Sequence, residues 1–549
     1  MKMKNLTSEQ IRQLRDEFWQ HPDRNHAYLK YASLVPDSSD KTVLFTTAWM
    51  QQLVPYLVGK PHPQWKRLYN IQKSLRTWDI DEVWDERHLT CFEMMGNWSL
   101  WDYFKKESLK WSIQFLNECL HIPLEKMWAS IFAWDDVLWI GEDTEARQIL
   151  NDLSIPNQRI KALWMDENFW GPAGEVWPCG PCTEIHVDRG SNWWKDDWNI
   201  WENDRFLEVW NNVFMEFYKN EDWTFSKLSQ QNVDTGMWIE RLCLILQWTQ
   251  TVFETDLFSG IMDEIQKATQ ISYPPFWKNE NDLNSQEKII TKNFRIIADH
   301  IRTSVFMIWD GVVPSNEFRG YVLRRLIRRL YHSLIMLNSK VDYKDFVWKV
   351  FQKINKKYWW YYIQIPSSKD QILNSLISEI DQFRWTIQRW KNILEKIFSK
   401  TTNNVISGDD LFQLYDTYGF PVELTKEIAE QKWFDVDIQK FYEKMEEAKE
   451  VSRKWTKDVF KRWVDWGKYL DWIKATKFMW YDSLDLENIE ILKDFTIDWQ
   501  RVIVLDKTPF YAESGGQTSD IGRIKTDKEE LLKVKDVQNI TWVYLHFID

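Results

Sequence analysis

Residues 87–107 read R-H-L-T-C-F-E-M-M-G-N-W-S-L-W-D-Y-F-K-K-E, and this stretch sets the expected fold. Residues 90–95 alternate in polarity and are aromatic enough to predict a strand. The Gly-Asn pair at 96–97 predicts the end of that strand. A serine at 99 with an aspartate three residues on resembles a capping box, which predicts the start of a helix.

The upstream segment Ser74-Leu75-Arg76 predicts the end of another short strand. An arginine on one strand that faces an aromatic such as Phe92 on the next would suit a nucleotide, with the guanidinium on phosphate and the ring on adenine. An ordinary hairpin with a surface arginine fits the same pattern, so these residues alone leave both interpretations open.

A longer pattern narrows the choice. S-L-R-T-x-D-I-x-x-V, then R-H-x-T-x-F-E-M-M-G-N-x-S-x-x-D-Y-F-K, resembles motif 2 of the alanyl-tRNA synthetases, a class II aminoacyl-tRNA synthetase family. The resemblance continues in order along nearly the whole chain. It implies an α+β fold, in which an antiparallel sheet flanked by helices is followed by a helical domain and part of a β-rich domain. The expected domains are catalytic (1–245), tRNA-recognition (246–460) and a truncated N-terminal part of the editing domain (461–549).

Composition places the protein among globular proteins. The chain has 549 residues, of which 44% are hydrophobic and 28% charged. No apolar run reaches the length of a transmembrane helix, and residues 1–20 lack the apolar core of a signal peptide. The charged fraction and the lack of an apolar span predict no membrane partner. Five cysteines without framework spacing predict a reducing, cytoplasmic setting. Because the net charge is −12, any RNA contact must come from local basic patches.

Tryptophan and glycine are present in unusual numbers: Trp 37 and Gly 17. Glycine at about 7% would give roughly 38 residues. Asp222-Trp223 and Asp498-Trp499 lie between strand-like runs, where Asp-Gly is the usual hairpin signal. Where the resemblance predicts glycine, the chain carries Trp49, Trp101, Trp177 and Trp238. Our hypothesis is that the source cell reads UGA as glycine; true tryptophan enrichment is the alternative.

The resemblance also implies a set of site residues. Arg76 would neutralise the α-phosphate of ATP and Arg241 the γ-phosphate, as the two catalytic residues. Residues 206–218 predict a buried strand, and residues 232–241 resemble motif 3, a strand leading into a helix. The implied ATP-binding residues are Arg76, Phe92, Glu208 (which would help to hold Mg²⁺), Gly236 and Arg241. The implied alanine-binding residues are Met50, Trp170, Val213, Asp234 (facing the α-amino group) and Gly236.

The pair Cys179 and Cys182 forms a lone C-x-x-C. Zinc would need two further ligands, and a redox motif expects a thioredoxin-like context. The prolines and glycines around the pair favour a tight active-site loop with structural or substrate-lining cysteines.

Four arginines at helical spacing, Arg324, Arg325, Arg328 and Arg329, predict guanidinium groups along one side of a helix. Such a row suits a phosphate backbone, although a solvated or ion-paired helix face gives the same spacing. The flanking D-G-V-V-P-S-N resembles the family's tRNA-recognition helices. There, residues matching Asn316 and Asp416 read the G·U pair of the alanine acceptor stem. The implied tRNA-binding residues are Asn316, Arg324, Arg325, Arg328 and Asp416.

Residues 501–517 look like the opening of the family's editing domain, whose chemistry needs an H-x-x-x-H pair and a later Cys/His pair on zinc. After His332 the chain has only His546, and no cysteine follows Cys243. We therefore expect no zinc site and no complete editing site here, and a separate chain could carry the rest. The expected activity is that of a ligase joining L-alanine to tRNA(Ala) with ATP and Mg²⁺. A non-catalytic tRNA-binding relative, a truncated gene product and a free-standing editing hydrolase are the alternatives.

Overall fold

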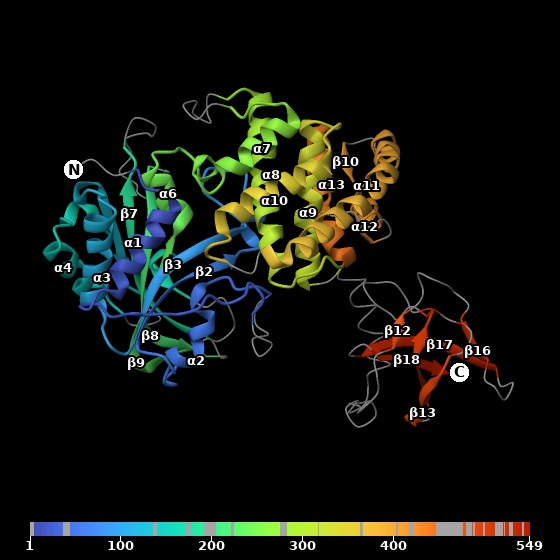
Figure 1. Cartoon of the computed structure of the whole chain (residues 1–549), viewed down its shortest axis with the longest axis horizontal. Helices are drawn as coiled ribbons and strands as arrows, with labels where there is room; N and C mark the ends of the chain where they lie inside the picture. The colour runs from blue at the N-terminus through green and yellow to red at the C-terminus, as the bar shows by residue number, and fades with distance from the viewer. Residues whose placement is uncertain are drawn as a thin grey trace. The chain divides into compact units, whose positions relative to one another are not determined.

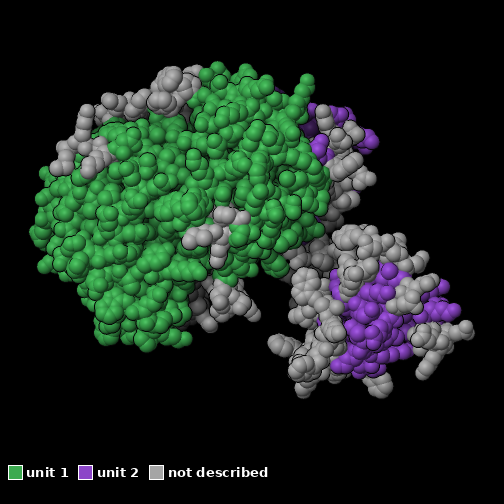
Figure 2. All heavy atoms as spheres, in the orientation of Figure 1, with its two compact units in different colours: residues 1–383 green, residues 384–549 purple. Residues whose placement is uncertain are grey.

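The computed structural model describes residues 5–36, 44–135, 140–171, 177–190, 205–220, 224–274, 283–316, 318–362, 366–401, 404–416, 422–445, 476–478, 486, 489–497, 500–510, 520, 522–525, 531–540 and 543–548. The chain forms two compact units, residues 1–383 and 384–549 (Figure 2). Each unit is described by itself. The functional division at 245 and 460 stays a prediction.

The first unit is built on a mixed, mainly antiparallel sheet (Figure 1). Only the β1–β2 and β4–β5 pairs in it are parallel. Its order is β1 (Ala27–Tyr28), β2 (Arg67–Leu75), β3 (Cys91–Leu100), β9 (Phe225–Trp238), β8 (Phe206–Lys219), β7 (Trp177–Asp188), β4 (Met127–Phe132) and β5 (Ile160–Leu163), with β6 (Phe169–Trp170) paired to β7. The predicted buried strand at 206–218 and the strand-into-helix at 232–241 are confirmed by β8, β9 and α6.

Helices flank this sheet. Helix α3 packs on β8, and α6 packs on β3, β8 and β9. The described helices are α1 (Ser8–Gln20), α2 (Val54–Leu57), α3 (Lys105–Gln114), α4 (Thr144–Asp152), α5 (Met165–Asn168), α6 (Ile239–Leu246), α7 (Ser259–Thr269), α8 (Ser285–Trp309), α9 (Phe318–Leu337) and α10 (Tyr343–Tyr358). A capping box at Asn284 and Glu287 starts α8, whose length is set by a nearly continuous buried face. The predicted α+β class is confirmed.

The prediction for residues 96–100 is wrong. Strand β3 runs through Gly96 and Asn97 to Leu100, and the next helix begins only at Lys105. Both edges of β3 are paired, to β2 on one side and β9 on the other, so the ladder carries the strand past the glycine. Ser99 Oγ does accept the N–H groups of Asp102 and Tyr103, at 3.2 and 2.8 Å, but it closes a turn.

The predicted loop at Cys179 and Cys182 is also wrong. Both cysteines lie in β7, where the pairing to β8 shifts register between them. Both are buried, and burial raises the pKa of Cys179 to about 12. Gly180 lies between them because a Cβ there would stand 2.0 Å from the carbonyl oxygen of Phe214. A β-bulge with inert, buried thiols accounts for the motif.

The second unit contains α12 (Gly408–Asp416), α13 (Val422–Gln431) and a five-stranded sheet. Helix α11 (Lys369–Lys400) contains the boundary between the units. The sheet order is β13 (Ile491–Ile497), β14 (Gln500–Leu505), β18 (Val543–Ile548), β17 (Leu531–Ile540) and β16 (Gly522–Lys525). Two strand pairs stand apart from it: β10 (Val405–Ile406) with β11 (Asp435–Val436), and β12 (Lys477–Phe478) with β15 (Lys507–Thr508).

Candidate active site

Neighbouring strands bring most of the predicted ATP and alanine residues to one region of the first sheet. Arg76 follows the last residue of β2, and its N–H donates to the carbonyl of Thr90 at 3.0 Å, which fixes it beside Phe92 on β3. Asp234, Gly236 and Trp238 alternate along β9, so their Cβ directions share one face. Met94 of β3 pairs with Trp238, which joins the two strands at this face.

The ring of Phe92 stacks against another aromatic ring in this chain. The indole of Trp238 lies parallel to it, with ring centroids 3.6 Å apart and an interplanar angle of 12°. The guanidinium carbon of Arg76 is 5.1 Å from the Phe92 centroid and 5.6 Å from the Trp238 ring. Because Phe92 is fully buried, no face of its ring is open to a ligand. The position where the resemblance expects adenine to stack on Phe92 is thus already occupied by the indole of Trp238.

Arg241, in the first turn of α6, contacts Glu208 of β8. Its Nη1 donates to Glu208 Oε2 at 2.6 Å and to the Glu208 carbonyl at 3.2 Å. Burial raises the pKa of Glu208, but Arg241, His186 and Arg76 together lower it by more, so the net pKa lies below its ordinary value. Glu208 therefore stays ionised next to two arginines, which suits a carboxylate that helps to hold a cation beside phosphates.

Sequence reasoning missed two polar residues at this site, Glu184 and His186 on β7. His186 pairs with Glu208, and its Nε2 lies 3.3 Å from Glu184 Oε2. Burial and the negative charge of Glu208 raise the pKa of Glu184. The alternation T-E-I-H-V-D at 183–188 was the available signal, because it places three polar side chains on one face of a strand.

Three of the predicted alanine-binding residues lie on the paired strands β8 and β9, and the other two lie on other elements. Val213 pairs directly with Asp234, and Gly236 pairs with Asn211 beside them. A Cβ on Gly236 would come within 2.8 Å of Met94 Sδ, so the backbone approaches closely there. Met50 is buried in η1 (Trp49–Leu53), and half-buried Trp170 pairs with Gly180. The side chains of Trp49 and Trp177 lie outside the described residues.

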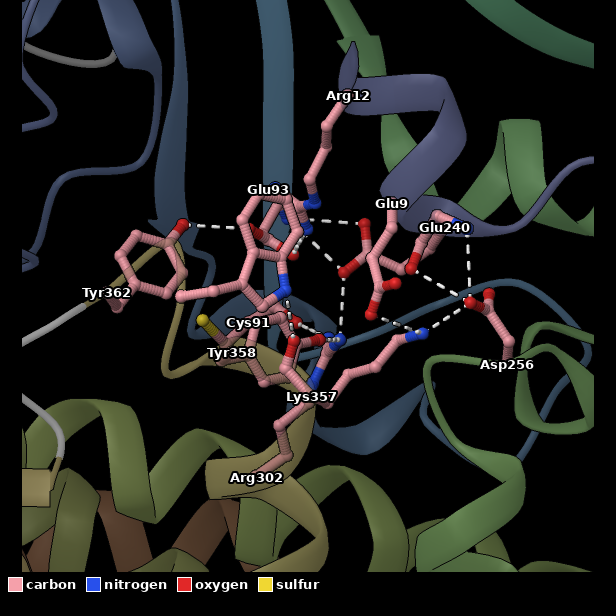
Figure 3. A network of polar contacts seen from close by, with 12 residues as sticks. Glu9, Arg12, Cys91, Glu93, Glu240, Asp256, Arg302, Lys357, Tyr358 and Tyr362 are labelled. Atoms are coloured by element: carbon pink, nitrogen blue, oxygen red, sulfur yellow. Dashed lines mark hydrogen bonds and ion pairs between the residues drawn. The ribbon is translucent and has the colours of Figure 1, made fainter.

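A buried ion network lies next to the site (Figure 3). Glu93 follows Phe92, and its carboxylate accepts Arg12 Nη2 at 2.5 Å and the Tyr362 hydroxyl at 2.7 Å. Glu240 precedes Arg241 and accepts the backbone N–H of Glu93 at 3.2 Å and Arg302 Nη1 at 2.9 Å. Arg302 also donates to the carbonyl of Cys91. The network therefore ties β3 and α6, which carry Phe92 and Arg241, to helix α8.

The predicted tRNA-binding arginines are ion-paired. Arg324 and Arg328 contact Glu379 at 3.2 and 2.8 Å, and Arg324 also contacts Asn316. Arg325 and Arg329 contact Asp81 at 2.9 and 3.3 Å. Ion pairing thus accounts for the i, i+4 spacing in this structure. Asp416 ends α12, and its side chain lies outside the described residues.

Metal-binding residues are sparse. Among the residues that the structure describes, no three or more His, Cys, Asp or Glu side chains are placed to hold a metal ion. His546 is buried between Thr508 Oγ1, at 2.7 Å, and the Ile503 carbonyl, at 3.0 Å, and burial lowers its pKa to about 4. This histidine packs as a structural residue. Within the described residues, no helix is long and apolar enough to cross a membrane.

Residues 11–549 match the family model described as tRNA synthetases class II (A). The chain belongs to this family. The resemblance to alanyl-tRNA synthetases is confirmed by relatives named alanine–tRNA ligase. The one from Thermotoga maritima is 37% identical over 95% of this chain, and the one from Petrotoga mobilis is 37% identical over 98%. The one from Fusobacterium nucleatum is 36% identical over 99%.

The chain spans 59%, 60% and 61% of the length of these three relatives, in that order. Among solved structures, apo histidyl-tRNA synthetase from S. aureus matches with a TM-score of 0.28 and 13% identity, covering 44% of this chain and 65% of that one. Family membership rests on the sequence match.

Proposed function

We propose that this protein is a ligase that attaches L-alanine to tRNA(Ala) through an alanyl-adenylate, at the expense of ATP. The observation that supports it best is the gathering of Arg76, Asp234 and Arg241 around adjacent strands of one sheet. The class II family and the alanine–tRNA ligase relatives agree with this proposal.

In the proposed reaction the alanine carboxylate attacks the α-phosphorus of ATP, and pyrophosphate leaves. The terminal hydroxyl of the tRNA then attacks the carbonyl carbon of the mixed anhydride, an ester bond forms, and AMP leaves. Arg76 would stabilise charge on the α-phosphate and Arg241 on the γ-phosphate, and Asp234 would pair with the α-amino group of alanine. Positioning and charge stabilisation by the protein carry the rate.

Glu208 is the residue best suited to hold Mg²⁺. Its pKa is lowered by Arg241 and its other cationic neighbours, whereas burial and the charge of Glu208 raise the pKa of neighbouring Glu184. A bound Mg²⁺ would favour ionisation of both. No zinc is proposed.

The RNA side of the proposal assigns Asn316 and Asp416 to the acceptor-stem G·U pair and the α9 arginines to phosphates. Because Glu379 and Asp81 pair with those arginines in this structure, tRNA phosphates would have to compete with the two carboxylates. The protein would work in the cytoplasm. The editing site would need another chain or further sequence.

The second candidate function is that of a non-catalytic tRNA-binding relative, and one observation favours it. With Trp238 stacked on Phe92, the predicted adenine position is filled. This reading predicts tRNA binding without alanine-dependent turnover.

The test is ATP–pyrophosphate exchange by the protein isolated from its source cells, with alanine, glycine and serine as substrates. We expect exchange with alanine to exceed that with glycine or serine by only about 10–200-fold, because one methyl or hydroxyl group changes binding by about 1–3 kcal/mol. Charging of tRNA(Ala) should follow. tRNA binding with no exchange would refute the proposal in favour of the non-catalytic reading.

A further inference from the structure

Many tryptophans lie where a large apolar ring gains little. Tryptophan is usually well buried, because it removes more apolar surface from water than any other side chain. In the described part of the chain, nine tryptophans are exposed: Trp65, Trp78, Trp84, Trp101, Trp134, Trp164, Trp248, Trp359 and Trp433. Exposure alone does not say what residue belongs there, but the backbone does at three of these positions.

Two of them end helices in the left-handed conformation. Trp248 follows α6 with φ 57°, and the N–H of Thr249 donates to the carbonyl of Leu244 at 3.2 Å. Trp433 follows α13 with φ 65°, and the N–H of Phe434 donates to the carbonyl of Ala429 at 2.9 Å. Both have the six-to-one hydrogen bond of a Schellman motif, in which the left-handed residue is usually glycine.

The third is Trp101, in the turn after β3. Its φ is 53°, and 63% of the residue is exposed, so the ring compensates little for the backbone strain. A hairpin adds an independent sign. Ile497 and Gln500 pair directly, and only Asp498 and Trp499 join them in the sequence. Two-residue hairpin connections favour Asp-Gly, from which this pair differs at one position.

Position 238 adds a functional sign. Its backbone is ordinary, with φ −80°, so strain does not argue for glycine there. Space does. The indole lies 3.6 Å from the Phe92 ring, at the distance where a flat purine would stack. Arg76 lies over both rings, and Arg241 lies over the indole. Removing the side chain at 238 would uncover one face of Phe92 beside Arg76 and vacate the space next to Arg241.

We propose that the functional protein carries glycine at positions 101, 238, 248 and 433, because these codons are UGA and the source cell reads UGA as glycine. One codon reassignment then explains the shortage of glycine, the surplus of tryptophan, the left-handed tryptophans and the filled adenine position. The part concerning position 238 rests on the proposed ATP-dependent function. The parts concerning 101, 248 and 433 do not.

The structure also says which tryptophans are genuine. Trp19, Trp98 and Trp210 are almost completely buried. Trp19 packs against Phe18 at 5.0 Å and Trp210 at 6.5 Å between ring centroids. Glycine at these positions would leave large cavities in the core, so we expect UGG codons there.

The test combines the gene's codons with peptide mass spectrometry on the protein from its source cells. We expect UGA, and peptides lighter by an indolylmethyl group for each site, at 101, 238, 248 and 433. We expect UGG and unchanged masses at 19, 98 and 210, which serve as matched controls. Tryptophan in the native peptide at any of the four positions would overturn the inference, and glycine at a control would overturn the structural sorting.

This outcome is separable from the proposed function. Glycine at the four positions in a protein without alanine-dependent exchange would refute the function and leave the codon assignment standing. Tryptophan at 238 in a protein with full exchange would refute the assignment and leave the function standing.

Discussion

At the scale of single residues, Gly180 is fixed by a close backbone approach. A Cβ there would stand 2.0 Å from the Phe214 carbonyl oxygen, a backbone atom that cannot rotate away. We expect Gly180→Ala to lower the free energy of unfolding by about 1–3 kcal/mol, or to prevent folding. The matched control is Gly171→Ala, where no residue that the structure describes lies within 4 Å of the added Cβ. Equal denaturant midpoints for the two variants would contradict this account of the bulge.

At Trp433 the effect of backbone strain can be measured apart from side-chain packing, because 89% of the residue is exposed. Alanine and glycine both remove the ring, but only glycine removes the cost of the left-handed conformation, about 1 kcal/mol. We therefore expect Trp433→Gly to slow hydrogen exchange at the end of α13 by about fivefold relative to Trp433→Ala. Exchange as fast in the glycine variant as in the alanine variant would show that strain at this position is negligible.

The sequence could anticipate residues whose signal is local. Arg76 and Phe92 were expected to face each other across two strands, and the guanidinium lies 5.1 Å from the ring. Glu184 was missed because its importance comes from Glu208, on a neighbouring strand and far along the sequence. The raised pKa of one carboxylate beside the other is a property of the assembled sheet.

At the scale of elements, the errors share a cause. Gly96-Asn97 and the C-x-x-C stretch carry turn-forming residues, and both were predicted to interrupt strands. Both lie inside strands with neighbours on each side, which for the C-x-x-C stretch are β6 and β8, so ladder hydrogen bonds outweigh local propensity. The ion pairs of the α9 arginines could not be predicted from the sequence either, because their partners Asp81 and Glu379 are distant in sequence.

The buried network gives an element-scale prediction. Arg302 joins α8 to Glu240 and to the carbonyl of Cys91, and both charged side chains are fully buried. Arg302→Met should lower the free energy of unfolding by about 3–5 kcal/mol, because it leaves Glu240 charged and unpaired. The double variant Arg302→Met, Glu240→Gln should recover part of that loss.

The control for the network is Lys349→Met, which breaks an exposed pair with Asp345 at 2.7 Å. It should change stability by less than about 0.5 kcal/mol. A loss for Arg302→Met no larger than for Lys349→Met, measured by denaturant unfolding, would show that the network does not hold α8 to β3 and α6.

At the scale of the whole molecule, the family was predictable because its motifs follow one another along nearly the whole chain. The α+β architecture was predictable because strand patterns and helical patterns occupy successive parts of the sequence. The division into units 1–383 and 384–549 places helices α7 to α10 in the same unit as the first sheet. Helices such as α8 contact β3 directly, a relation that the helical pattern of the sequence does not reveal. The match covers about 60% of the relatives' length, so tRNA handling by the whole protein remains part of the proposal.

The central claim is that this sheet activates alanine and that the residue at position 238 decides whether ATP can enter. The most direct measurement is alanine-dependent ATP–pyrophosphate exchange by two forms of the full chain. One has tryptophan at 101, 238, 248 and 433, and the other has glycine at all four. We predict exchange by the glycine form and little or none by the tryptophan form, with reversion of position 238 alone enough to abolish it. Equal exchange by the two forms would contradict the account.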